Sequence, residues 1–264
     1  YFVWNELMKG ELIKLHGANE GQISVTGIPQ FDIYADPITA NDREKFLIEQ
    51  GLYPGKRTIL FATSAGGDTP EEPEILKRLV HSLNESHPEN IQFLVRIHRR
   101  DDVGRYAAIA GSNVKFQVPG APIAHLDDQR LMEQSDLRLL RDTLAYTDVL
   151  VNTASTISID AAALDKPVVN IKFDLHKTDY IHSVRRYFDM VHYKPFVGSQ
   201  ATCLATSFDE MLTMIERYLD NSEFEHEQRY QLAKTMCYKV DGKSAERISS
   251  YLLDALYGKP IPKE

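Results

Sequence analysis

Small hydroxyl residues directly follow an apolar run in the middle of the chain. Residues 148–152 (DVLVN) read as a buried strand, and residues 157–164 are Ala-rich and favour a helix. Between these segments lie Thr153, Ala154, Ser155 and Thr156. Backbone N–H groups at a helix start and hydroxyl side chains both donate hydrogen bonds to phosphate. The turn is therefore a candidate anion site.

Asp160 lies one helical turn beyond this site. A carboxylate there is able to accept hydrogen bonds from ribose hydroxyls, as acidic residues do in other nucleotide-binding α/β folds. Alternatively, Ser155 or Thr156 caps the helix and Asp160 complements its dipole. The turn alone leaves both interpretations open.

A second strand signal, residues 57–63 (RTILFAT), ends in a short flexible loop. That loop contains Ser64, Gly66 and Gly67. Adjacent glycines let the backbone approach a ligand closely, or they simply form a turn. The spacing and the Lys-Ser/Thr ending of a phosphate loop of the Walker type are absent.

A third strand signal, residues 91–97 (IQFLVRI), leads into the densest positive cluster of the chain. His98, Arg99 and Arg100 follow it at once. Cations at the carboxyl end of a strand are well placed to bind a diphosphate. The alternative is a solvated loop whose cations pair with Asp101 and Asp102.

Strands and helices alternate along the chain, which predicts an α/β fold. We expect a Rossmann-like, mostly parallel sheet with helices on both faces, so that the three polar strand ends share one edge. The expected strands are 57–63, 91–97, 114–118, 148–152, 167–173 and 201–205, and the expected helices are 41–50, 73–86, 103–110, 137–146, 157–164, 208–219, 225–237 and 245–257.

The first residues predict a separate β-α-β unit, with strands at 1–4 and 22–26 and a helix at 5–16. Gly and Pro residues punctuate the chain after it. We therefore expect two units, residues 1–35 and residues 36–264. Because the chain begins at Tyr1 inside an apparent strand, we interpret it as the carboxyl part of a longer protein.

Composition narrows the class of protein. The 264 residues carry a net charge of −8, which argues against a nucleic-acid partner. No apolar run reaches the roughly 18 residues of a membrane helix and no signal peptide is visible, so we expect a cytoplasmic protein. Cys203 and Cys237 lack metal-ligand spacing and are expected to be buried thiols.

Three passages give the chain a family resemblance. They are residues 3–6 continuing through 25–32, residues 148–156 with Asp160 and residues 166–168, and residues 241–247 (DGKSAER). Together they resemble the carboxyl-terminal, donor-binding half of a GT-B glycosyltransferase. The resemblance is strongest to the CDP-glycerol glycerophosphotransferases and related surface-polysaccharide glycosyltransferases.

The resemblance implies transfer of a sugar from a nucleotide-diphosphate sugar to a surface or capsular glycan. A CDP-glycerol glycerophosphotransferase, a nucleotide-sugar 2-epimerase and a non-catalytic nucleotide-binding domain are the alternatives. The implied partners are a nucleotide-activated donor and a glycan or lipid-linked acceptor, with no cofactor and no metal. The catalytic base would lie in a preceding amino-terminal domain. Whether that domain also makes a peripheral contact with the inner face of the cell membrane is left open.

The resemblance also implies roles for individual residues. Residues 153–156, with Ser64 and Gly66, would hold the donor phosphates. His98 would contact a phosphate, although Arg99 replaces the proline of the family's His-Pro pair. The ribose and base would lie near Asp160, Pro119 and Gly120, and the transferred group near Asp174. A metal site formed by Asp174, His176, Asp179 and His182 fits no named ligand spacing.

Overall fold

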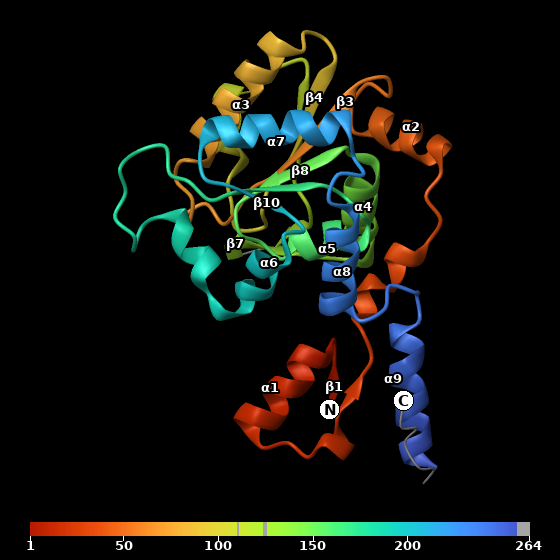
Figure 1. The fold of residues 1–264 in the computed structure, drawn as a ribbon. Helices are drawn as coiled ribbons and strands as arrows, with labels where there is room; N and C mark the ends of the chain where they lie inside the picture. Colours follow the sequence, from red (N-terminus) through yellow and green to blue (C-terminus); the bar gives the residue numbers. More distant parts are fainter. Residues whose placement is uncertain (110, 124–125, 258–264) are drawn as a thin grey trace.

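The computed structural model describes residues 1–109, 111–123 and 126–257. Its centre is a six-stranded sheet in which every neighbouring pair of strands is parallel (Figure 1). The predicted α/β class is therefore confirmed. In spatial order the strands are β10 (Cys203–Ala205), β9 (Val168–Ile171), β8 (Val149–Asn152), β3 (Arg57–Ala62), β4 (Ile91–Arg96) and β5 (Val114–Gln117).

Both faces of this sheet are covered by helices. Ile59 and Phe61 point to one face, where they pack with residues of α3 (Glu72–Ser86) and α7 (Phe208–Asp220). Leu60, between them, points to the other face. That face is covered by α2 (Ala40–Glu49), α4 (Gln134–Tyr146) and α5 (Ile157–Ala163). Burial on both faces explains why the strands read as continuous apolar runs.

The strand order reverses between β3 and β8. The chain passes from β3 to β4 and β5 on one side, and from β8 to β9 and β10 on the other. The two central strands pair up to Ala62 and Asn152. Beyond that point one chain enters α3 on one face and the other enters α5 on the opposite face. In open α/β sheets such a reversal forms the crevice that binds ligands.

The first residues and the last helix that the structure describes lie close together, below the sheet in Figure 1. The first residues form β1 (Phe2–Val3), α1 (Glu6–His16) and β2 (Ser24–Val25), as predicted. A 3-10 helix (Glu20–Gln22) precedes β2, and another (Pro29–Ala35) leads toward the sheet domain. The last helices are α8 (His226–Cys237) and α9 (Ser244–Leu256). The division into residues 1–35 and 36–264 stays a prediction.

Specific hydrogen bonds attach these end segments to each other and to the rest. The Asn5 amide donates to the Met236 carbonyl at 2.8 Å. The Asp32 carboxylate accepts from the backbone N–H groups of Ser244 and Ala245, at 2.8 and 2.9 Å. Asp32 thereby caps the start of α9 from the 3-10 helix at Pro29–Ala35.

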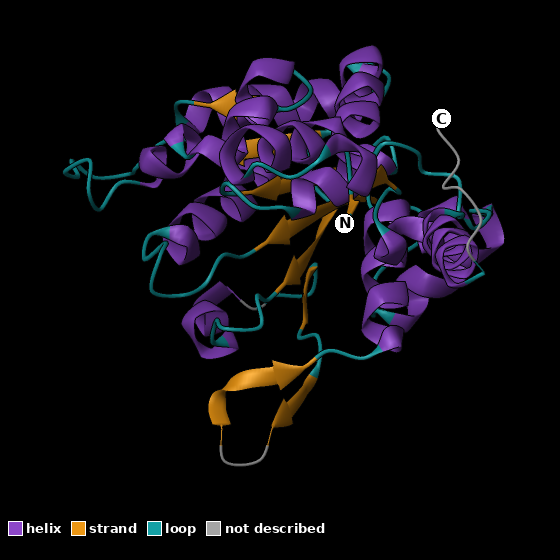
Figure 2. Cartoon of the chain, turned by 90° about the horizontal axis from the view of Figure 1, so that it is seen from below, coloured by secondary structure: helices purple, strands orange, loops and turns teal. Residues whose placement is uncertain are grey.

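Three segments differ from the sequence prediction. An antiparallel hairpin, β6 (Ala121–Ile123) and β7 (Leu126–Leu131), projects from the domain (Figure 2). The segment Val103–Ile109, expected to be a helix, is a 3-10 helix, and Asp102 Oδ1 accepts the Gly104 N–H at its start. Ala110, the last residue of that expected helix, lies outside the described residues. After β9 the chain forms 3-10 helices Val184–Asp189 and Val191–Tyr193 and the short α6 (Lys194–Ser199), where the sequence analysis assigned no element.

Two smaller expectations concern cysteines and membrane helices. Cys203 and Cys237 are buried and unpaired, as predicted. Within residues 1–109, 111–123 and 126–257, none of the helices combines the length and apolarity needed to cross a membrane.

Arg229 provides a test of the fold. Its side chain is fully buried and donates to Asp165 Oδ1 at 2.8 Å and to the carbonyls of Phe224 and Ser222 at 2.6 and 2.7 Å. Lysine cannot reproduce this planar set of three contacts. We expect Arg229→Lys to lower the free energy of unfolding by about 3 kcal/mol in urea denaturation.

The control is Arg138→Lys, since Arg138 lies exposed on α4. That substitution should leave the unfolding midpoint nearly unchanged. Equal midpoints for the two variants would contradict the role given to Arg229.

Candidate functional site

The candidate site lies where β8, β3 and β4 end side by side. Asn152, Ala62 and Arg96 occupy one row across the three strands, so the loops that follow start at the same level. With strands about 5 Å apart, the ends of β8 and β4 are about 10 Å apart. The three polar strand ends predicted from the sequence therefore share one edge.

The turn between β8 and α5 offers hydroxyl groups. Thr156 precedes α5, yet its side chain makes no capping hydrogen bond, and its own backbone is already helical. The Ser155 backbone N–H donates to the Tyr193 hydroxyl at 3.3 Å. Among the described residues, neither the Ser155 nor the Thr156 hydroxyl has a hydrogen-bond partner. Capping, the alternative interpretation, does not account for these two side chains.

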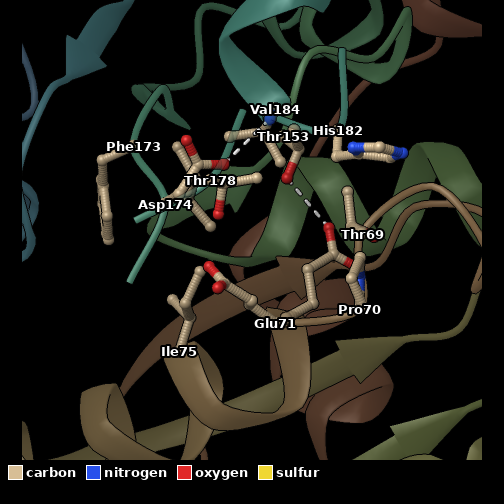
Figure 3. A pocket seen from close by; sticks show the side chains of 12 residues that line it. Thr69, Pro70, Glu71, Ile75, Thr153, Phe173, Asp174, Thr178, His182 and Val184 are labelled. Carbon is tan, nitrogen blue, oxygen red and sulfur yellow. Dashed lines mark hydrogen bonds between the residues drawn. The ribbon is translucent and has the colours of Figure 1, made fainter. Parts of the chain in front are cut away.

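Thr153 and Ser64 have a protein partner that the sequence did not suggest. Both hydroxyls donate to Glu72, the first residue of α3, at 2.9 Å each. In Figure 3 the Thr153 side chain reaches toward the start of α3 along one of these bonds. Donation to the donor phosphates by these two hydroxyls stays a prediction, because each is occupied here.

His98 is oriented by the loop after β4. Its backbone N–H donates to Thr63 Oγ1 at 2.9 Å, and its ring Nδ1 accepts the backbone N–H of Arg100 at 3.1 Å. The ring hydrogen therefore lies on Nε2. Burial, reinforced by the charges of Arg100 and Arg99, lowers the pKa of His98 below its usual value. At neutral pH His98 is consequently a neutral hydrogen-bond donor, while Arg99 is exposed beside it.

Gly66 has no side chain, and the space beside it is filled by side chains from elsewhere in the protein. A Cβ atom at this position would lie 2.5 Å from Asp101 Oδ1 and 2.9 Å from Arg105 Nη1. These two residues form an ion pair, with 2.6 Å between Arg105 Nη1 and Asp101 Oδ1. Close packing of Gly66 thus has a structural reason, and its contact with phosphate stays a prediction.

Asp160 is buried and bonded to a residue far away in the sequence. Its Oδ1 accepts the hydroxyl hydrogen of Tyr34, which lies in the 3-10 helix Pro29–Ala35. Burial raises the pKa of Asp160 to about 6, although Tyr34 and the charge of Arg96 oppose that rise. The carboxylate therefore joins α5 to the segment that leaves the first unit. Its contact with ribose stays a prediction.

Pro119 and Gly120 form the base of the β6–β7 hairpin. The Gly120 N–H donates to Asp136 Oδ1 at 2.8 Å, and the Arg130 side chain donates to both their carbonyls. Gly120 has φ +76°, and a Cβ atom there would lie 2.8 Å from the Leu131 carbonyl. The turn is held tightly at the end of β5. Binding of the base there stays a prediction.

Asp174 lies beside a small cavity of about 90 Å³ at the end of β9 (Figure 3). Its carboxylate accepts from Ser183 Oγ at 2.6 Å and from the Val184 N–H at 3.0 Å, which fixes the loop after β9. Other residues that line the cavity are Thr69, Glu71, Glu72, Ile75, Thr153, Phe173, Thr178 and His182. Polar groups on an apolar wall are typical of a small-molecule site.

Four residues were considered for a metal, namely Asp174, His176, Asp179 and His182. Their ligand atoms do not come close enough together to hold one ion. In the part of the chain that the structure describes, Asp165, Glu223 and His226 do form such a group. Its Asp165, however, pairs with the Arg229 guanidinium. That guanidinium already neutralises the carboxylate.

Comparison with known proteins identifies relatives over most of the chain. The family model "CDP-Glycerol:Poly(glycerophosphate) glycerophosphotransferase" matches residues 2–254. Teichoic acid ribitol-phosphate polymerase TarL of Staphylococcus aureus is 25% identical over 236 residues, which cover 88% of this chain and 37% of the relative. The chain spans 37–40% of the lengths of the curated relatives it matches.

Solved structures share the fold at low sequence identity. The wall teichoic acid polymerase TagF, in a structure soaked with CDPG, has a TM-score of 0.62 and 13% identity, covering 97% of this chain and 58% of that chain. A UDP-GlcNAc 2-epimerase of Neisseria meningitidis bound to UDP-GlcNAc has a TM-score of 0.60 and 14% identity, covering 96% and 60%. Both confirm the fold class.

Asp160 gives the site a pH-dependent signature. Because its pKa is about 6 in the folded chain against a usual 3.8, the folded state binds the proton more tightly than the unfolded state. The free energy of unfolding should therefore fall as the pH rises from 4 to 7. Asp160→Asn removes this titration, so its stability relative to the unchanged chain should rise by about 2 kcal/mol over that range.

Urea denaturation at several pH values measures this difference. Asp220→Asn, at an exposed position on α7, serves as the control and should show no such trend. A stability difference for Asp160→Asn that does not vary with pH would contradict the buried, raised-pKa state of Asp160.

Proposed function

Because the chain belongs to the CDP-Glycerol:Poly(glycerophosphate) glycerophosphotransferase family, we propose that it is the donor-binding part of a transferase that builds a surface polymer. Its donor is a polyol phosphate activated as a cytidine diphosphate, and its acceptor is the growing polymer. This proposal selects the CDP-glycerol alternative of the sequence analysis over a nucleotide sugar. The description of the matching family supports the choice, since it names CDP-glycerol.

One observation carries the proposal more than any other. At the edge where the strand order reverses, the Ser155 and Thr156 hydroxyls make no hydrogen bond to another described residue. Across β3 from them, His98 presents a neutral Nε2–H, and Arg99 adds an exposed positive charge. Such groups bind a diphosphate, which carries negative charge and offers only acceptors.

The proposed reaction places negative charge at this edge. The acceptor hydroxyl oxygen forms a bond to the phosphorus that carries the polyol, and the bond from that phosphorus to the bridging oxygen breaks. The nucleoside monophosphate leaves with the electron pair of that bond. Hydrogen bonds from Ser155, Thr156 and His98 would stabilise the charge that develops on the leaving phosphate. The acceptor proton goes to a base that we place in a preceding domain.

The cavity beside Asp174 is proposed to take the polyol itself. Its mixture of threonine hydroxyls and carboxylates suits a small chain of hydroxyl groups. Asp174 is fixed there by Ser183 and Val184, so that its orientation is set before a ligand enters.

Calorimetric titration tests the donor site. We expect this chain to bind CDP-glycerol, and a variant with both Ser155→Ala and Thr156→Ala to bind it at least about tenfold more weakly, which corresponds to about 1.4 kcal/mol. Titrations with UDP-GlcNAc and ADP in parallel separate a cytidine donor from the epimerase and from general nucleotide binding.

The control variant carries Thr213→Ala and Ser249→Ala, two exposed hydroxyl residues on the remote helices α7 and α9. Its affinity should equal that of the unchanged chain. The proposal fails if the folded chain binds none of these nucleotides, or if the double substitution at 155 and 156 leaves the affinity unaltered.

A further inference from the structure

We propose that Glu72 is a positioning residue that joins the two loops on either side of the strand reversal and so holds the donor site in shape. This inference rests on the proposed function for its effect on donor binding. The link between the loops is visible in the unliganded chain. Glu72 was not among the residues that the sequence suggested for the site.

Three hydrogen bonds form the link. Glu72 Oε2 accepts the Ser64 backbone N–H at 2.9 Å, and Oε1 accepts the Ser64 hydroxyl at 2.9 Å. The same Oε1 accepts the Thr153 hydroxyl at 2.9 Å. Ser64 belongs to the loop after β3, and Thr153 begins the loop after β8. A single carboxylate, only 1% exposed, therefore contacts both loops.

The position of this link explains why a link is needed. The last paired residues of the two central strands are Ala62 and Asn152, and no β-ladder continues beyond them. From there the chains diverge to opposite faces of the sheet, toward α3 and α5. Glu72 bridges the crevice just beyond that row. Its partner Thr153 lies one residue beyond the end of β8, and its partner Ser64 lies two residues beyond the end of β3. Thr153 directly precedes residues 154–156, so the bridge also fixes where the Ser155 and Thr156 hydroxyls lie.

A buried carboxylate is an energetically unfavourable group to use for a purely structural contact. Burying a carboxylate away from water destabilises its charged form, and burial accordingly raises the pKa of Glu72 against its hydrogen bonds. The nearby Arg105 is already paired with Asp101, and the Tyr106 hydroxyl donates to Asp101 at 2.8 Å. Glu72 thus lacks a direct ion-pair partner among the described residues. Replacement of Glu72 by the neutral glutamine removes the cost of burying this charge.

Glu72→Gln tests the inference, because it keeps the shape of the side chain and replaces one acceptor oxygen by an NH₂ donor. With the glutamine oxygen toward the Ser64 N–H, that NH₂ faces the Ser64 and Thr153 hydroxyls, which must turn to accept from it, so that charge-assisted hydrogen bonds are replaced by weaker neutral ones. We expect CDP-glycerol to bind about tenfold more weakly, with a thermal unfolding midpoint equal to or above that of the unchanged chain. A residue with a purely structural role would show the reverse, a lower midpoint and unchanged affinity of the folded protein.

Hydrogen–deuterium exchange without nucleotide measures the link directly. In Glu72→Gln, the amides of the loop after β3, Ser64 above all, and those of residues 153–156 should exchange faster together. Glu85→Gln, at an exposed position on the same helix, is the matched control and should alter neither affinity nor exchange. If the unchanged chain binds no nucleotide, the proposed function fails, whereas the exchange experiment still decides whether Glu72 joins the loops.

Thr153→Val supplies a second variant that keeps the carboxylate. It breaks the bond to one loop only, so residues 153–156 should exchange faster while Ser64 stays protected. Its effect on donor affinity should not fully add to that of Glu72→Gln in the double variant, because both substitutions act on the same link. Unchanged exchange in both loops of Glu72→Gln, or fully additive effects of the two substitutions, would overturn the inference.

Discussion

The pairing of β3 with β8 is the contact on which the rest of the molecule depends. These two strands lie at the centre of the sheet, and the chain builds outward from them in opposite directions. Their parallel pairing aligns Ala62 with Asn152, which sets the level at which the loops begin. Ala62 also pairs with Arg96 of β4, so Ser64, His98 and Ser155 of the proposed donor site all lie two or three residues beyond one row.

Several charged side chains are buried around this centre. Glu72 and Asp160 lie on opposite faces of the sheet, and each accepts hydrogen bonds from distant segments. Arg96 is also buried and donates to Gln117. Buried carboxylates raise the energy of the folded state unless they are bonded, so they hold particular partners in place. One joins two loops of the proposed donor site, and the other joins α5 to the segment leading from the first unit.

Much of the fold could be predicted because its strands are buried on both faces. Residues such as those of β3 and β4 form short apolar runs that alternate with helical patterns, which is sufficient for the class and the strand count of the sheet. The β6–β7 hairpin was not predicted, because the sequence of β7 (LDDQRL) lacks both an apolar run and regular alternation. The short helices between β9 and β10 were not predicted either, because their aromatic and basic residues do not recur at one regular spacing.

The site was predictable only where it follows local sequence. Ser155, Thr156 and His98 could be proposed because they directly follow strands. Glu72 could not, since the run Glu71, Glu72 and Glu74 looks like the acidic first turn of any helix. The bond from Tyr34 to Asp160 joins residues 126 positions apart and depends on the tertiary fold. Local patterns identified the ends of strands, whereas the partners across the crevice required the structure.

The most direct test of the account is a crystal structure of this chain with CDP-glycerol. The account predicts that the diphosphate lies between the β8–α5 turn and the loop after β4, within hydrogen-bond distance of the Ser155 and Thr156 hydroxyls and of His98 Nε2. It also predicts that Glu72 keeps its bonds to Ser64 and Thr153. A nucleotide bound elsewhere, for instance in the hollow between α1 and α8 that Glu6 and Tyr230 help to line, would contradict it.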